Sequence, residues 1–231
     1  MAKQTLLGAL WRWLAFLVLV PVAAAELWAL LVSIGGEAAE AFRTGPAAEA
    51  VWLSCGAAAY ALLHLFLHRP ITTYVFGHEL THALWALATG HKVGRIQVGK
   101  ESGQVETEGT NFIVRLAPYF FPLYTLILVG GWLLAELVWP ELRPHRGWLF
   151  AGMGFTYAFH ALLTIHSLKA GQSDLAAEGL FFSLALIAAV NLQIVAALLA
   201  AASRTVTWLG YEKCVGRTLY EWAGWLTDLF R

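Results

Sequence analysis

Long apolar stretches that are almost free of charge recur along this chain, and they constrain its fold more than any other feature. Six such stretches are apparent, at residues 8–34, 47–67, 71–89, 112–139, 147–168 and 175–202. A helix of roughly 20 apolar residues crosses the ~30 Å hydrocarbon core of a bilayer. We therefore predict an all-α polytopic membrane protein with about six hydrophobic helical segments.

The composition points the same way. Hydrophobic residues make up 59% of the chain and charged residues 13%, against about a quarter charged in a typical soluble domain. The formal net charge is zero, which gives no reason to expect a nucleic acid or a broadly anionic partner. Cys55 and Cys214 form neither a disulfide framework nor a metal-ligand pair by their spacing. No repeat or linker is visible, so we expect one membrane domain over residues 1–231.

The basic residues favour one orientation in the membrane. Six crossings place both termini on the same side, and the positive-inside rule makes that side the cytoplasm. The residues assigned to it are Lys3, Arg69, Arg143, Arg146, Arg204, Lys213 and Arg217, against Arg43, Lys92, Arg95, Lys100 and Lys169 on the other side. We predict an integral, multi-pass protein with cytoplasmic N and C termini.

Two parts of the chain are not expected to span. Between His91 and Asn111, apolar and polar residues alternate around the glycines of 99–103, which favours a β-hairpin over a polar loop. In the tail, residues 204–231, apolar side chains recur at steps of three and four, with most charges elsewhere on the wheel. This predicts an amphipathic helix lying along the membrane interface, with packing on a partner protein as the alternative.

The third apolar stretch contains the sequence His78-Glu79-Leu-Thr-His82. One helical turn separates the two histidines, so their imidazoles project from one face and can take two corners of a tetrahedral zinc site. Glu79 then lies beside the metal, where a carboxylate can act as general base and then as general acid. Ionisable groups are costly at membrane depth, which favours a functional site over a polar cluster that only joins helices.

This motif resembles that of the site-2 protease family of intramembrane zinc metalloproteases. The resemblance covers roughly residues 71–190: the Gly77–Ala83 motif in a hydrophobic helix, followed by a short β-like insert. It implies one Zn²⁺ per chain, held by His78, His82 and, from a second motif, Asp174. In the family an Asn before this Asp is proposed to steady the scissile carbonyl, and His166 occupies the matching position. The prolines of the second motif, and the Gly after the Asp, are absent here.

The third metal ligand stays open on sequence grounds. At ~1.5 Å per residue, His82 lies roughly 16 Å below Ile71, near the middle of a bilayer. Strict alternation of crossings leaves Asp174 roughly 10–15 Å from that level, unless the stretch from Lys169 to Ser173 forms a non-helical turn within the membrane. His160 and Glu178 are the alternative ligands.

We expect an endopeptidase that cuts membrane-protein or peptide substrates in or near transmembrane segments. Glu79 is the expected general base and His166 a further catalytic residue. One alternative is a CAAX-type membrane zinc protease with a Glu ligand. Another is a pseudoprotease or membrane chaperone that binds helices without cutting them, of which a metal transporter is a weaker version.

Overall fold

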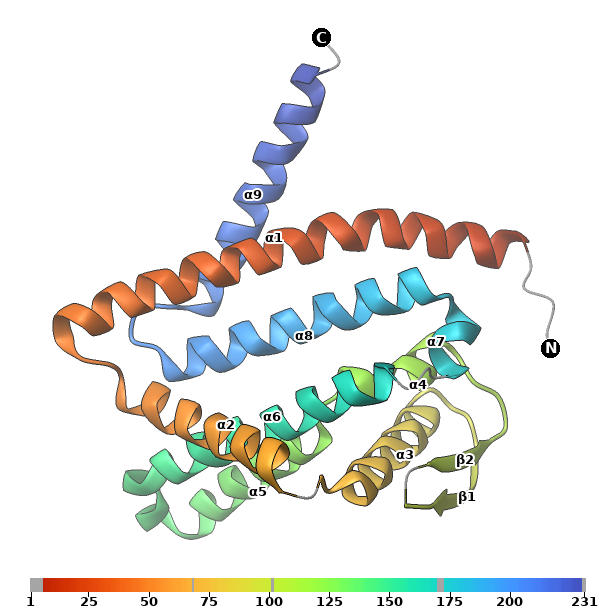
Figure 1. The fold of residues 1–231 in the computed structure, drawn as a ribbon, viewed down its shortest axis with the longest axis horizontal. Coiled ribbons are helices and arrows are strands. Elements are labelled where there is room, and N and C mark those ends of the chain that lie inside the picture. The colour runs from red at the N-terminus through yellow and green to blue at the C-terminus, as the bar shows by residue number, and fades with distance from the viewer. Residues whose placement is uncertain (1–5, 68, 101, 170–172, 230–231) are drawn as a thin grey trace. The chain divides into compact units, whose positions relative to one another are not determined.

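The computed structural model describes residues 6–67, 69–100, 102–169 and 173–229 (Figure 1). The chain is mostly helical, with one small antiparallel hairpin. Contacts between residues divide it into a central unit, Ala48–Ala177, and a terminal unit, which combines the residues up to Ala47 with those from Glu178 onward. The single domain expected from the sequence stays a prediction.

The central unit contains both strands and most of the helices. Its elements are α2 (Ala48–Phe66), α3 (Ile71–Ala88), β1 (Val93–Val98), β2 (Gly103–Thr107), α4 (Phe112–Leu116), the 3-10 helix η1 (Ala117–Tyr119), α5 (Leu123–Val138), the 3-10 helix η2 (Pro140–His145), α6 (Arg146–Lys169) and α7 (Ser173–Glu178), of which only Glu178 belongs to the terminal unit. A buried cluster of aromatic and aliphatic side chains, Tyr60, Tyr74, Phe159 and Leu163, joins α2, α3 and α6.

Two glycines let α2 and α6 pack backbone to backbone. A Cβ atom on Gly56 would lie 1.8 Å from the carbonyl oxygen of Ala151, and one on Gly154 would lie 1.9 Å from that of Leu53. Small residues at such crossings are typical of helix pairs in membranes, where close packing replaces the hydrophobic effect. The pair α2–α6 is therefore a rigid support for the elements around it.

The fourth apolar stretch is a broken helix. The segment Phe112–Tyr119, made of α4 and η1, meets α5 at an angle of 77°. Asn111 begins it, because its side-chain oxygen accepts a hydrogen bond of 3.0 Å from the backbone N–H of Val114. Pro118 and Pro122 lie on either side of the break. A proline has no backbone N–H to donate, so it interrupts the hydrogen bonds of a continuous helix. The helix is therefore bent between Tyr119 and Leu123.

The hairpin predicted between His91 and Asn111 is confirmed. β1 and β2 pair antiparallel, with Val93 opposite Thr107 and Val98 opposite Gly103. A backbone hydrogen bond of 2.8 Å from Gly99 to Ser102 closes the turn. Each strand pairs on one side only among the described residues, so each keeps a free edge.

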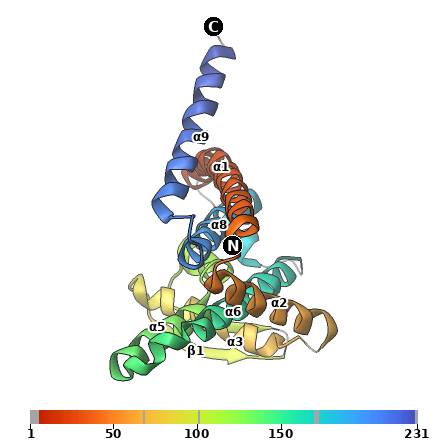
Figure 2. The same cartoon turned by 90° about the vertical axis from the view of Figure 1, so that its left-hand side faces the viewer.

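The terminal unit consists of α1 (Leu6–Thr44), α8 (Leu180–Ala202) and α9 (Trp208–Leu229). Small residues of α1 and α8, Ala25, Ala29 and Ala196, pack with Tyr211 and Val215 of α9 in one cluster. Figures 1 and 2 show α9 meeting α1 with its first half and extending away from it with its second half. The amphipathic helix expected in the tail is present.

Four described helices are long and apolar enough to cross a membrane: α1, α2, α8 and the continuous Pro140–Lys169. The broken pair of α4–η1 and α5 makes a fifth if it counts as one span. The expected count of about six is not confirmed. α3 is absent from this set, and its motif residues His78, Glu79 and His82 lower its mean hydropathy.

The glycine contact between α2 and α6 can be tested directly. We expect Gly56→Ala to lower the stability of the protein by roughly 1–3 kcal/mol, because the added methyl group forces two backbones apart. The measurement is the melting temperature in detergent. Gly130→Ala in α5 is the matched control, since a Cβ there meets nothing within 4 Å. Equal melting temperatures for the two variants would contradict the packing described.

Candidate metal centre

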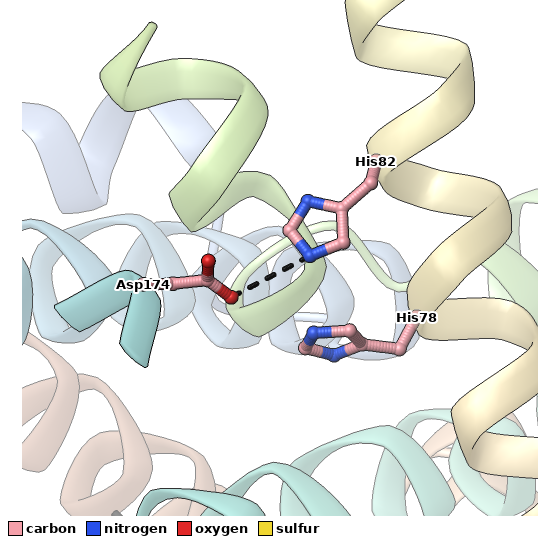
Figure 3. A group of neighbouring side chains, drawn as sticks. All are labelled: His78, His82 and Asp174. Atoms are coloured by element: carbon pink, nitrogen blue, oxygen red, sulfur yellow. Dashed lines mark ion pairs between the residues drawn. The ribbon is translucent and has the colours of Figure 1, made fainter. Parts of the chain in front are cut away.

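The motif predicted from the sequence lies on the inward face of α3. His78, Glu79 and His82 are all buried, with exposed fractions of 9%, 6% and 8%. The helical spacing brings the two imidazole rings edge to face, with their centroids 4.8 Å apart. Figure 3 shows both rings projecting from α3 toward the same point. Two nitrogen ligands are thus placed by local structure alone.

Asp174 approaches this point from the opposite side, on α7 (Figure 3). Its Oδ2 atom lies 3.5 Å from Nε2 of His82. One ligand atom from each of His78, His82 and Asp174 lies within 4.8 Å of the other two, so a single metal ion can reach all three side chains. Among the described residues, no other group of three or more His, Cys, Asp or Glu side chains comes this close together.

If each apolar stretch crossed the membrane in turn, Asp174 would lie ~10–15 Å from the level of His82. The 3.5 Å distance shows that this separation is wrong. That expectation required α3 and α6 to be complete, consecutive spans with Asp174 at the far surface. Instead α3 is not one of the clear spans, and α7 turns Asp174 back toward it. The non-helical turn predicted at Lys169–Ser173 falls largely on residues 170–172, which lie outside the described residues.

The two alternative ligands do not join the group. His160 is buried in α6, but it is not among the three clustered side chains. Glu178 forms an ion pair with Arg12, with Oε2 and Nη2 2.6 Å apart. This pair already supplies a positive charge to the Glu178 carboxylate. The geometry therefore favours Asp174 as the third ligand.

The histidines are oriented for binding. Nδ1 of His82 lies 2.7 Å from the carbonyl oxygen of Val114 in α4. A carbonyl only accepts hydrogen bonds, so Nδ1 carries a proton and Nε2 faces Asp174. Nδ1 of His78 is buried and has no hydrogen-bond partner among the described residues.

The Asp174 carboxylate also accepts a hydrogen bond of 3.1 Å from the hydroxyl of Tyr119. A hydrogen bond donated to the carboxylate favours its ionised form, which is the form that binds metals. The sequence analysis did not single out Tyr119; its place between Pro118 and Pro122 in an apolar stretch was the available signal.

Two cavities meet at the motif. One, of about 310 Å³, is lined by Tyr74, Val75 and Leu163 and reaches His166 and Ser167. The other, of about 290 Å³, has a more polar lining that includes His82, Asp174 and Arg115. His78, Glu79 and Gly103 line both. The Glu79 side chain is therefore buried by protein but lies beside space large enough for water.

Gly103, the first residue of β2, packs directly against Glu79. A Cβ atom at this position would lie 2.5 Å from Cγ and 2.8 Å from Oε1 of Glu79. Only glycine lets the hairpin come this close. In the sequence this glycine indicated only a turn, and its contact with Glu79 could not be predicted.

His166 lines the larger cavity together with His78 and Glu79. Its Nδ1 atom is 3.4 Å from Nη1 of Arg69. The structure brings His166 to the same cavity as the motif but does not include it in the metal group. Its catalytic role stays a prediction.

Comparison with protein-family models, with curated proteins and with solved structures finds no match to this chain.

The geometry predicts one zinc ion per chain. We expect His82→Ala and Asp174→Ala to lose most of the bound zinc, because each removes one of three ligands. His160→Ala and Glu178→Ala should retain it, and His145→Ala, at an exposed position, is the control. Elemental analysis of the purified chain measures the ratio. Zinc retained in Asp174→Ala but lost in Glu178→Ala would reverse the ligand assignment.

Proposed function

We propose that this chain is an intramembrane zinc metallopeptidase of the site-2 protease type, which hydrolyses peptide bonds in or near transmembrane segments of other membrane proteins. One observation carries the proposal: two histidines from α3 and a carboxylate from α7 meet within 4.8 Å, with Glu79 beside them at two cavities. A cluster that only joined helices would not need a carboxylate next to space for water.

The donor set fits zinc. Two imidazoles and one carboxylate suit Zn²⁺ and leave a fourth position open, whereas Mg²⁺ and Ca²⁺ prefer oxygen ligands. The hydrogen bond between Nδ1 of His82 and the Val114 carbonyl supports this fit, because it holds the ring with Nε2 directed toward Asp174. When held by these three side chains, Zn²⁺ would supply Lewis acidity that lowers the pKa of water toward ~7.

Glu79 is the proton carrier in this proposal. Its carboxylate accepts a proton from the attacking water, whose oxygen forms a bond to the scissile carbonyl carbon. The same group then donates that proton to the leaving amine as the C–N bond breaks. One water is consumed, and no oxidant or further reactant is needed.

His166 is proposed to donate a hydrogen bond to the scissile carbonyl. The guanidinium of Arg69 can only donate, so Nδ1 of His166 is the acceptor of their 3.4 Å contact. The ring proton of a neutral His166 then resides on Nε2. The imidazole thus has the tautomer that a hydrogen-bond donor requires.

The hairpin is proposed to hold the substrate. A transmembrane helix hides its amides in internal hydrogen bonds, so the cleaved stretch must be extended before attack. Gly103, Gln104, Val105 and Thr107 of β2 line the smaller cavity beside the metal group. A free strand edge can pair with an extended peptide through its backbone. Such pairing places the peptide beside Glu79.

The membrane arrangement is part of the proposal. We propose that about six hydrophobic segments enter the bilayer, with α3 and the broken α4–α5 pair contributing, and that both termini are cytoplasmic. The second half of α9 exposes Trp222, Trp225, Leu226 and Leu229. We propose that these side chains lie in the membrane interface, where tryptophan is favoured.

We expect Glu79→Gln to retain one zinc per chain and to lose cleavage, because an amide of the same size cannot accept the proton of water. Cleavage is measured with a set of fluorescently labelled transmembrane helices mixed with the zinc-loaded chain in detergent. Glu49→Gln, at an exposed position of α2, is the matched control. Cleavage by Glu79→Gln at the wild-type rate would rule out this mechanism. If the wild type cleaves none of these helices, a role that binds helices without cutting them is favoured instead.

Gly103→Ala tests the contact between hairpin and base. The added methyl group must displace Glu79 or β2, and misplacing a catalytic group by about 1 Å costs roughly 100-fold in rate. We expect turnover to fall by at least about tenfold with the zinc content unchanged, since Gly103 contacts none of the three ligands in this way. Gly131→Ala, with open space around its Cβ, is the control. Unchanged turnover would show that this contact does not position Glu79.

A further inference from the structure

The segment Phe112–Tyr119 contacts all three members of the metal group. The carbonyl oxygen of Val114 lies 2.7 Å from Nδ1 of His82. The hydroxyl of Tyr119 donates to Oδ2 of Asp174 at 3.1 Å, and the Tyr119 ring packs edge-on against His78 with centroids 5.0 Å apart. The ends of this short segment thus reach ligands from two different helices.

Asp174 depends on such a contact more than the histidines do. It lies in the first turn of α7, a helix of six residues, whereas the histidines lie within the 18 residues of α3. The Oδ2 atom that receives the Tyr119 hydrogen bond is the same atom that faces Nε2 of His82. The hydroxyl therefore acts on the carboxylate oxygen that faces His82.

Tyr119 is itself held firmly. Its side chain is fully buried, with an exposed fraction of 0%, and its neighbours Leu116 and Ala117 are equally buried. Pro118 precedes it and restricts the backbone at the break between η1 and α5. A fully buried ring on a constrained backbone has little freedom, so its hydroxyl is a fixed point for the carboxylate.

We propose that Tyr119 is a positioning residue of the metal centre, whose hydroxyl fixes the Asp174 carboxylate in the orientation that binds the ion. The proposal rests on the metal site proposed above, and it identifies the residue that orients the third ligand, Asp174. Partners that orient metal ligands typically contribute about 10–100-fold to metal affinity. A phenol suits this role, because it donates one hydrogen bond without adding a charge that would compete with the ion.

Tyr119→Phe is the direct test, because it removes the hydroxyl and keeps the ring that packs on His78. We expect the zinc affinity of the full chain in detergent, measured by competition with a chelator, to fall by about 10–100-fold. Tyr60→Phe is the matched control: Tyr60 is also buried in the central unit, with an exposed fraction of 1%, and its hydroxyl has no hydrogen-bond partner among the described residues. Its zinc affinity should equal that of the wild type.

A second comparison shows whether the effect passes through Asp174. In an Asp174→Ala background, adding Tyr119→Phe should cause no further loss of zinc affinity, whereas a general packing defect would add to the loss. Melting temperatures of the zinc-free variants, measured in parallel, report any change in packing directly.

The outcomes separate this inference from the proposed function. If the wild type binds one zinc and Tyr119→Phe binds it as tightly as Tyr60→Phe does, the positioning role is wrong and the metal site stands. The positioning role is also wrong if Tyr119→Phe weakens binding equally with and without Asp174. A wild type that binds no zinc contradicts the proposed function itself.

Discussion

Four ionisable side chains line one cavity: His78, Glu79 and His82, which are buried, and Asp174, which is partly buried. This crowding is the constraint that the central unit has to satisfy. Each group loses hydration on burial, which costs several kcal/mol unless a partner replaces the water. The structure supplies partners: a carbonyl for His82, a hydroxyl for Asp174, and cavity space beside Glu79. A divalent cation held by the two histidines and the aspartate would supply the remaining compensation, which is why a metal is the most economical account of the cluster.

The surrounding irregularities are consistent with this requirement. α3 is too polar to pass as an ordinary span, because one of its faces carries the motif. The next apolar stretch breaks at 77°, and the break directs a backbone carbonyl and a tyrosine hydroxyl at two of the ligands. Irregular backbone at membrane depth is tolerated where it lines a cavity or is enclosed by protein. The close packing of α2 on α6 through Gly56 and Gly154 gives these irregular pieces a firm base.

The sequence predicted the parts of this arrangement that follow local rules. The spacing of His78 and His82 places both on one helical face, and alternation around Gly99–Gly103 predicts the hairpin. The assignment of Asp174 as the third metal ligand came from a family resemblance. Helix rise alone argued against this assignment, because that calculation assumes that each apolar stretch is a straight and complete span. The contacts of Tyr119, Gly103 and the Val114 carbonyl could not be predicted, since each depends on how distant segments pack. The number of spans stays a prediction for a related reason: length and apolar content do not distinguish a crossing from a broken or motif-bearing helix.

The most direct measurement of the central claim is the X-ray absorption spectrum of the zinc-loaded, purified chain. The account predicts only nitrogen and oxygen neighbours around the zinc at about 2.0–2.2 Å, with the outer scattering pattern of two imidazole rings. That pattern should drop to one ring in His78→Ala if the variant still retains some metal. Sulfur neighbours at about 2.3 Å would instead implicate Cys55 or Cys214. Such a spectrum, or one without imidazole scattering, would contradict a metal centre built on His78, His82 and Asp174.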